Sequence, residues 1–175
     1  MKILILLTLL IISGCSSVPL STMVQHSGIS EKELINFDAE SLRVKIQTDS
    51  PVEVGSSDNK LSIELVSEGE VKTFSFALEN VSSSIIEEDG WLSGKRIINQ
   101  VVLKLNSESV AEFRELQREV VHTQQQPKKF FVPFQMENIE QADGKVVVSI
   151  FIKQNKKAEY IHLIDRHEIE VEFET

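Results

Sequence analysis

The chain has 175 residues, 41% of them hydrophobic and 26% charged, and these proportions fit one compact domain rather than two domains or a disordered chain. Asp and Glu outnumber Lys and Arg by 27 to 18, and the resulting formal charge of -9 argues against nucleic acid binding through a broad basic surface. A single cysteine excludes an internal disulfide framework and any site built from several thiolates.

The first fifteen residues predict a lipoprotein signal peptide. Lys2 precedes an apolar run over residues 3–12, ILILLTLLII, which is typical of the central region of a secretory signal. A helix of that length spans about 15 Å, half of a bilayer's hydrocarbon core, so it is too short for a stable transmembrane anchor. Residues 12–15, ISGC, match the bacterial lipobox, in which small residues precede a cysteine that receives diacylglycerol. The alternative is an ordinary secretory signal followed by a chance cysteine.

Cleavage before Cys15 would remove residues 1–14 and leave an acylated N-terminus. Lipoproteins normally carry three acyl chains on this cysteine, which is more than the two signals that stable anchoring requires. In the usual sorting pattern of Gram-negative bacteria, an Asp directly after the cysteine favours the inner membrane, whereas Ser16 and Ser17 follow here. We therefore expect a lipid-anchored protein on the periplasmic face of the outer membrane, with residues 15–30 as a tether.

Residues 31–175 are expected to form a single β-rich domain. Segments with alternating apolar residues and many β-branched or aromatic side chains predict eight strands. These strands are expected over residues 42–48, 61–66, 71–78, 97–105, 130–136, 146–152, 160–164 and 169–173. Strands in both halves of the chain with one longer helix between them favour a mainly β, sandwich-like domain of two packed antiparallel sheets, with that helix covering one edge or end.

Two helices are expected within this domain. Ser30 and Glu33 fit a capping box at the start of a short helix over about residues 31–38. Ser109 opens a second capping box, at the start of an amphipathic helix over about residues 109–123. The apolar side of this longer helix consists of Val110, Phe113, Leu116 and Val120.

The turn signals predict two hairpins in the middle of the chain. A two-residue turn at residues 68–69 places Ile63 opposite Phe74, so that the apolar residues of both strands share one face. Asp143 and Gly144 favour a hairpin between the strands at 130–136 and 146–152, with a bulge between residues 136 and 141.

A third hairpin is expected at the C-terminus. Glu residues at 168, 170, 172 and 174 alternate with apolar residues, which predicts one solvated face and one buried face. A three-residue loop at 165–167 then brings the buried face against Ile161 and Leu163, and it places His162 on the solvated face opposite Glu170.

Two short motifs resemble catalytic or phosphate-binding motifs, but their spacing does not fit those functions. Residues 57–60, SDNK, contain S-x-x-K and S-D-N, but these strings overlap in one segment, whereas penicillin-binding enzymes take them from separate elements. We interpret this segment as a polar turn. Residues 90–95, GWLSGK, have one residue too few for a phosphate-binding loop and lack the following Ser or Thr, so Asp89 and Gly90 are interpreted as a turn.

His162, Asp165 and His167 are the candidate metal ligands. They are close in sequence, yet the expected register puts His162 on the surface and His167 at a loop tip, which favours surface pairing over a zinc site. The C-terminal Glu residues could similarly form a docking face for a basic partner, with a solvated strand face as the simpler interpretation. No catalytic residue and no cofactor is expected.

The chain resembles envelope lipoproteins of proteobacteria. The resemblance lies in the lipobox, the PLST segment at residues 19–22, the LRV segment at 42–44 and the FRELQ segment at 113–117. It implies an envelope lipoprotein and assigns no activity or catalytic residue.

A permanent anchor without a catalytic motif favours a non-enzymatic module that binds another envelope protein or component. A secretion-system pilotin is one form that this function could take. The alternative is a periplasmic hydrolase, or a ligand- or metal-binding protein, whose site has no recognisable sequence motif.

Lipidation can be tested at Cys15. Cys15→Ala should abolish incorporation of labelled fatty acid and leave the protein unprocessed or soluble, because the acceptor thiol is absent. Metabolic labelling and membrane fractionation measure both effects. Continued lipid labelling of the Ala variant would contradict the lipobox assignment.

Overall fold

The computed structural model describes residues 23–24, 29–67, 69–90, 94–123, 126–142 and 144–170 of a mainly β protein. The strands are Met23–Val24 (β1), Arg43–Asp49 (β2), Glu53–Val54 (β3), Lys60–Ser67 (β4), Glu70–Gly90 (β5), Gly94–Leu105 (β6), Gln126–Phe131 (β7), Met136–Glu137 (β8), Lys145–Lys153 (β9) and Ile161–Glu170 (β10). The helices are Glu31–Ile35 (α1), Ser107–Thr123 (α2) and a 3-10 turn at Ile139–Gln141.

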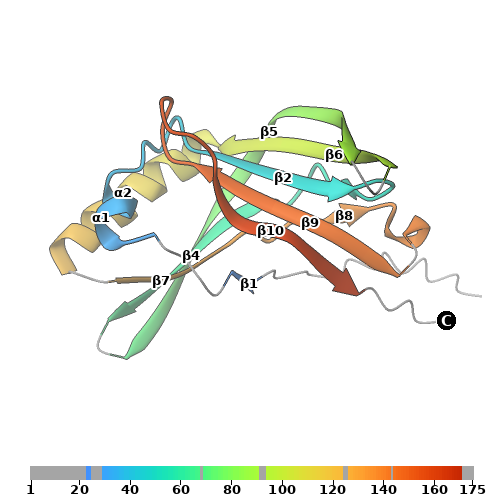
Figure 1. Cartoon of the computed structure of the whole chain (residues 1–175). Coiled ribbons are helices and arrows are strands. Elements are labelled where there is room, and N and C mark those ends of the chain that lie inside the picture. Colours follow the sequence, from blue (N-terminus) through green and yellow to red (C-terminus); the bar gives the residue numbers. More distant parts are fainter. Residues whose placement is uncertain are drawn as a thin grey trace, which may run out of the picture.

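Eight strands form one curled antiparallel sheet in the order β1-β7-β4-β5-β6-β2-β9-β10, and β3 pairs with β8 in a small second sheet (Figure 1). The predicted mainly β class is confirmed, but the predicted sandwich of two large sheets is wrong. The reason is β5, which has 21 residues and pairs first with β4 and then with β6. The two expected layers are therefore two halves of a single sheet that curls into a half-barrel.

The inner face of this half-barrel contains the hydrophobic core. Alternate residues of β2 are fully buried there, as expected for a strand with one face on a core. Aromatic rings connect the helices to the sheet. The Phe113 ring of α2 lies 5.2 Å edge-on from Phe76 of β5 and 6.4 Å from Phe37, and Phe37 lies 6.3 Å from Phe130 of β7.

The hairpin between β4 and β5 has the predicted register. Ile63 is paired with Phe74, Leu61 with Phe76, and Ser67 with Glu70, which leaves the two-residue turn that the sequence indicates. Gly69 has φ +87°, a left-handed conformation that favours glycine.

The hairpin predicted at Asp143 and Gly144 is wrong. β7 pairs with β4 and β1, whereas β9 pairs with β2 and β10. Residues 132–135, including Pro133, form no strand after β7, because proline has no amide to donate to a ladder. The bulge expected between residues 136 and 141 is replaced by β8 and the 3-10 turn, which buries Ile139 in the core.

The predicted C-terminal hairpin is also wrong. Residues 165–167 form no loop, because β10 continues through them and pairs with β9 from Ile161 to Glu170. The pairing of β10 with β9 is irregular at this polar segment, with register shifts between His162 and His167. Arg166 there has φ 44°, and its amide donates to Ser149 Oγ at 3.0 Å. His162 is therefore opposite Phe151 rather than Glu170, although it is exposed as predicted.

The two predicted helices are present with shifted ends. The capping box of Ser30 and Glu33 is confirmed at α1, which ends at Ile35 rather than near residue 38. α2 begins two residues earlier than predicted, because Asn106 Oδ1 accepts a hydrogen bond from the amide of Ser109 at 2.8 Å. The Ser109 hydroxyl instead accepts from the amide of Ala77 in β5 at 2.8 Å, and it attaches α2 to the sheet.

One side-chain amide holds α1 against α2. Gln117 Nε2 lies 2.9 Å from the carbonyl oxygen of Leu34, 3.1 Å from that of Ile35 and 2.9 Å from that of Phe37. Carbonyls at the end of a helix have no partner within the helix. The Leu34 carbonyl also accepts from the Phe37 amide at 3.2 Å, so the half-buried Gln117 amide is a second donor for Leu34 and a donor for Ile35 and Phe37.

Replacing Gln117 should therefore destabilise the fold. We expect Gln117→Ala to lower the free energy of unfolding by about 1–3 kcal/mol, because partly buried carbonyls lose their donor. The neighbouring Arg118→Ala removes only an exposed ion pair with Glu115 and should cost less than about 0.5 kcal/mol. Urea denaturation measures both values, and equal losses would contradict this role of Gln117.

Candidate functional site

The second half of β5 has a free edge. β4 pairs with β5 only as far as Ala77, whereas β6 pairs with it from Leu78 to Gly90. Beyond Leu78, no strand within the described residues lies on the other side of β5. An unpaired edge presents amide donors and carbonyl acceptors that can hydrogen-bond to another strand.

The pairing of β6 shows which residues of β5 face this edge. The carbonyl of Ile97 accepts from the amide of Ser50 at 2.9 Å, on the β2 side of β6. Successive residues of a strand direct their backbone groups to opposite sides, so Ile98 and Gln100 direct theirs toward β5.

Gln100 is paired with Ser84 of β5, so the backbone of Ser84 faces β6. The same alternation directs the amides and carbonyls of Ser83, Ile85, Glu87 and Asp89 away from β6. These four residues define the open edge of β5.

Apolar side chains are unusually exposed near the open edge. Ile85 is 72% exposed, and Val81 and Ile97 are 47% and 46% exposed. Residues 79–85 and 87–89 are all exposed, so this part of β5 is a strand without a buried face. Native proteins usually shorten, cover or charge such an edge.

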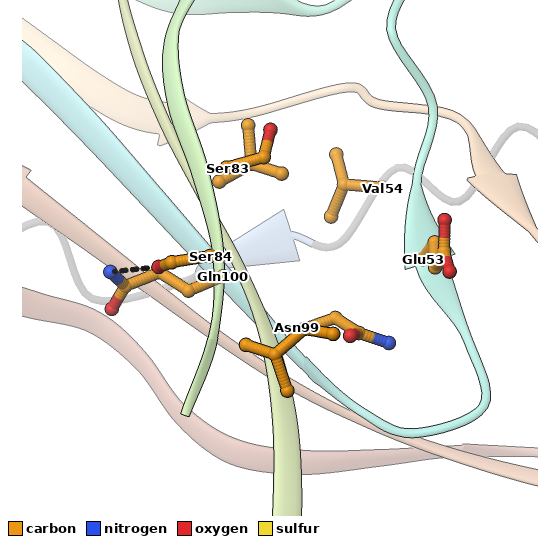
Figure 2. Close-up of a pocket in the computed structure, with 8 residues that line it drawn as sticks. Glu53, Val54, Ser83, Ser84, Asn99 and Gln100 are labelled. Atoms are coloured by element: carbon orange, nitrogen blue, oxygen red, sulfur yellow. Dashed lines mark hydrogen bonds between the residues drawn. The ribbon is translucent and has the colours of Figure 1, made fainter. Parts of the chain in front are cut away.

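A hollow of about 440 Å³ adjoins the open edge on the inner side of the sheet. Its lining residues are Glu53, Val54, Ser83, Ser84, Ile85, Asn99, Gln100 and Val101. Figure 2 shows Ser83 of β5 and Val54 of β3 facing each other across it, with Glu53 farther out. The hollow therefore lies between β3 and the β5–β6 pair.

Two amide side chains hold the walls of this hollow in place. Asn99 Nδ2 donates to the carbonyl of Val52 at 2.8 Å, which connects β6 to the segment before β3. Gln100 Nε2 donates to Ser84 Oγ at 3.3 Å, as Figure 2 shows. Among the eight lining residues only Glu53 is titratable, so the hollow suits apolar and hydrogen-bonded contacts better than acid–base chemistry.

Two of the three predicted metal ligands lie close together, and the third does not line the same hollow. His162 Nδ1 lies 3.6 Å from Asp165 Oδ1, and both residues line a second hollow of about 230 Å³ on the outer face of the sheet. His167 is not among the residues lining that hollow. No group of three or more His, Cys, Asp or Glu side chains in the described parts of the chain could hold a metal ion, so this candidate site is not assembled.

The second hollow is organised by ion pairs. Asp49 lies between two arginines, with Oδ1 3.9 Å from Arg96 Nε and Oδ2 3.3 Å from Arg166 Nη2. Arg96 also pairs with Glu88. These contacts connect β2, β5, β6 and β10 on the outer face and give the arginines a structural role.

The other sequence motifs lie in turns or strands. Residues 57–59 form the predicted polar turn and Lys60 begins β4; Asn59 in this turn is buried and donates to the carbonyl of Gly55 at 2.8 Å. Asp89 and Gly90, interpreted as a turn from the sequence, are instead the last two residues of β5, and the pairing of Gly90 with Gly94 places the chain reversal after them. Glu168 and Glu170 are exposed, as predicted for a solvated strand face, and Glu168 pairs with Lys145 at 3.1 Å.

Cys15, the signal peptide and the first part of the tether lie outside the described residues, as do Glu172 and Glu174. In the parts that the structure covers, no helix is long and apolar enough to cross a membrane. No protein-family model matches the chain, and no similar curated protein or solved structure is found.

Sequence reasoning missed the open edge because residues 79–90 lack apolar alternation. A usable signal was nevertheless present. Asp89 and Gly90 mark a turn before the strand predicted at 97–105, and a strand of similar length before that turn would have followed from the same argument that located the 68–69 hairpin.

Proline substitutions can test the direction of the backbone groups. Ser84→Pro should lower the free energy of unfolding by about 2–3 kcal/mol, because it removes an amide that faces β6. Ser83→Pro should cost less than about 1 kcal/mol, because proline is tolerated where the amide faces away from the neighbouring strand. Urea denaturation of both variants measures the difference, and a larger loss for Ser83→Pro would reverse the assigned directions.

Proposed function

We propose that this chain is a non-enzymatic, lipid-anchored binding module on the periplasmic face of the outer membrane, and that it binds an extended segment of another envelope protein along the open edge of β5. The signal and lipobox at residues 3–15 support the anchor. The observation that carries the binding function is the free second half of β5.

Strand addition uses the groups that the open edge presents. Ser83, Ile85, Glu87 and Asp89 offer successive outward amides and carbonyls, which is the arrangement that an incoming strand pairs with in β-augmentation. Main-chain hydrogen bonds of this kind supply affinity without requiring a particular sequence. They also align the incoming strand beside β5.

The hollow provides a basis for side-chain selection. Alternate side chains of an added strand point to the same side of the sheet as Ser83 and Ile85, toward the hollow that Val54 closes on the other side. Apolar side chains on the incoming strand would cover the exposed face of Ile85. This burial supplies a hydrophobic contribution that the isolated domain lacks.

Acidic residues indicate the charge of the partner. Asp89 and Glu53 have no ion-pair partner among the described residues, and Glu87 makes only an exposed pair with Lys95 at 3.4 Å. A segment that carries Lys or Arg next to its apolar positions is therefore the complementary partner.

Site-specific crosslinking in cells tests this function. A photo-crosslinking residue at Glu87 should form an adduct with another envelope protein, and Ser83→Pro should reduce the adduct about tenfold, because it removes one outward amide and obstructs pairing. Ser83→Ala is the matched control, because it keeps the amide and should preserve the adduct.

Two outcomes would contradict strand addition. One is an adduct that is equally strong with Ser83→Pro and Ser83→Ala. The other is an equal yield of the same adduct from Glu115, an exposed residue on α2 that is not part of the open edge. Amide exchange should also slow at Ser83, Ile85 and Glu87 when a peptide from the crosslinked partner is added.

A further inference from the structure

Ion pairs use eight of the 18 Lys and Arg side chains of this acidic chain. The cations within 4.0 Å of a carboxylate are Lys95, Arg96, Lys104, Arg114, Arg118, Lys129, Lys145 and Arg166. Lys32, Lys60, Lys72 and five further cations have no such partner among the described residues. We call these five the basic corner. They are Arg43, Lys45, Lys153, Lys156 and Lys157.

The sheet brings the basic corner together. Arg43 and Lys45 are alternate residues of β2, and Lys153 of β9 is paired with Arg43, so these three side chains lie on the outer face. Lys156 and Lys157 follow in the loop between β9 and β10, which projects beyond the end of the sheet in Figure 1. Cations from three segments therefore gather at one end of the molecule.

Aromatic rings rather than carboxylates hold two of these lysines. Lys45 Nζ lies 3.9 Å from the ring centroid of Phe151 and 4.5 Å from that of Tyr160, and Lys153 Nζ lies 5.8 Å from that of Tyr160. A cation–π contact positions an ammonium group without neutralising it. Burial lowers the pKa of Lys45. Burial also raises the pKa of Tyr160, although the positive charge of Arg43 acts in the opposite direction.

Nearby carboxylates do not cancel the basic corner. Glu40 is engaged by Arg114 at 2.6 Å. The Asp38 carboxylate accepts hydrogen bonds from Ser41 and from the Glu40 amide, and these bonds, assisted by the charge of Lys156, lower its pKa. Asp38 and Glu159 leave the five cations in excess, so this end of a chain with net charge -9 presents positive charge.

We propose that the basic corner contacts an anionic phospholipid surface. The projecting loop can present its cations to a flat layer of headgroups, and each lysine or arginine near such a surface strengthens binding about fivefold. Tyr160 and the 43% exposed Ile161 follow the two loop lysines and supply the amphipathic and apolar groups that favour a membrane interface. This contact is separate from the open edge of β5 and does not require it.

Vesicle partitioning tests the proposal on the full-length chain. The measured quantity is the ratio of its partition coefficients for vesicles of phosphatidylcholine with added phosphatidylglycerol and for phosphatidylcholine alone. This ratio cancels the binding of the apolar N-terminal segment to both vesicles. We expect Lys156→Gln combined with Lys157→Gln to lower the ratio about 25-fold, and high salt to lower the native ratio as well.

Lys60→Gln combined with Lys72→Gln is the matched control, because it removes two exposed lysines of β4 and β5 without an ion-pair partner among the described residues. Its ratio should exceed that of the loop variant by about 25-fold. An equal fall in both double variants, or no preference of the native chain for phosphatidylglycerol, would overturn the proposal. Binding of soluble polyglutamate without any vesicle preference would point instead to an acidic protein.

Discussion

The fold depends on the transfer of β5 from one neighbouring strand to another at Ala77 and Leu78. The Leu78 amide donates to the carbonyl of Asn59 at 2.8 Å, while the Ala77 carbonyl accepts from the amide of Asn106 at 3.2 Å on the opposite side. The Ala77 amide is taken by Ser109 Oγ, so α2 begins at the same point. Since one continuous strand carries both halves of the sheet, curling is the way the halves can share a core. The same transfer leaves the later part of β5 with no neighbouring strand on one side among the residues that the structure describes.

Local features of the sequence predicted local structure well. The hairpin at residues 68–69 follows from a turn and two alternating strands that agree with each other, and the cap at Ser30 follows from a short-range hydrogen-bonding pattern. Long-range pairing did not follow in this way. One partner of β9 is β2, which lies about a hundred residues earlier, and the choice between β2 and the nearer 130–136 segment depends on burial of the whole core.

The candidate site was difficult to predict for a different reason. Side chains suggested the motifs at 57–60 and 90–95 and the histidines near residue 165. The structure places the first motif at the turn before β4, the described part of the second at the paired ends of β5 and β6, and the histidines in the irregularly paired β10. The open edge is instead a property of backbone groups. Every residue except proline carries the same backbone amide, so no residue type in the sequence marks this edge. Serines at 82–84 exposed on both faces resemble a loop in sequence, although the ladder with β6 makes them a strand.

The length of β2 also sets the distance between the basic corner and the segment that leads into β3. This strand runs from Arg43, in the basic corner, to Asp49, next to the segment that leads into β3 and its hollow. Seven extended residues cover roughly 20 Å, and the hydrogen-bonded neighbours on both sides make the strand stiff. A bilayer bound at the basic corner and a partner segment bound at the open edge would therefore be held apart by a rigid strand. The partner segment would bind in the aqueous compartment, away from the lipid headgroups.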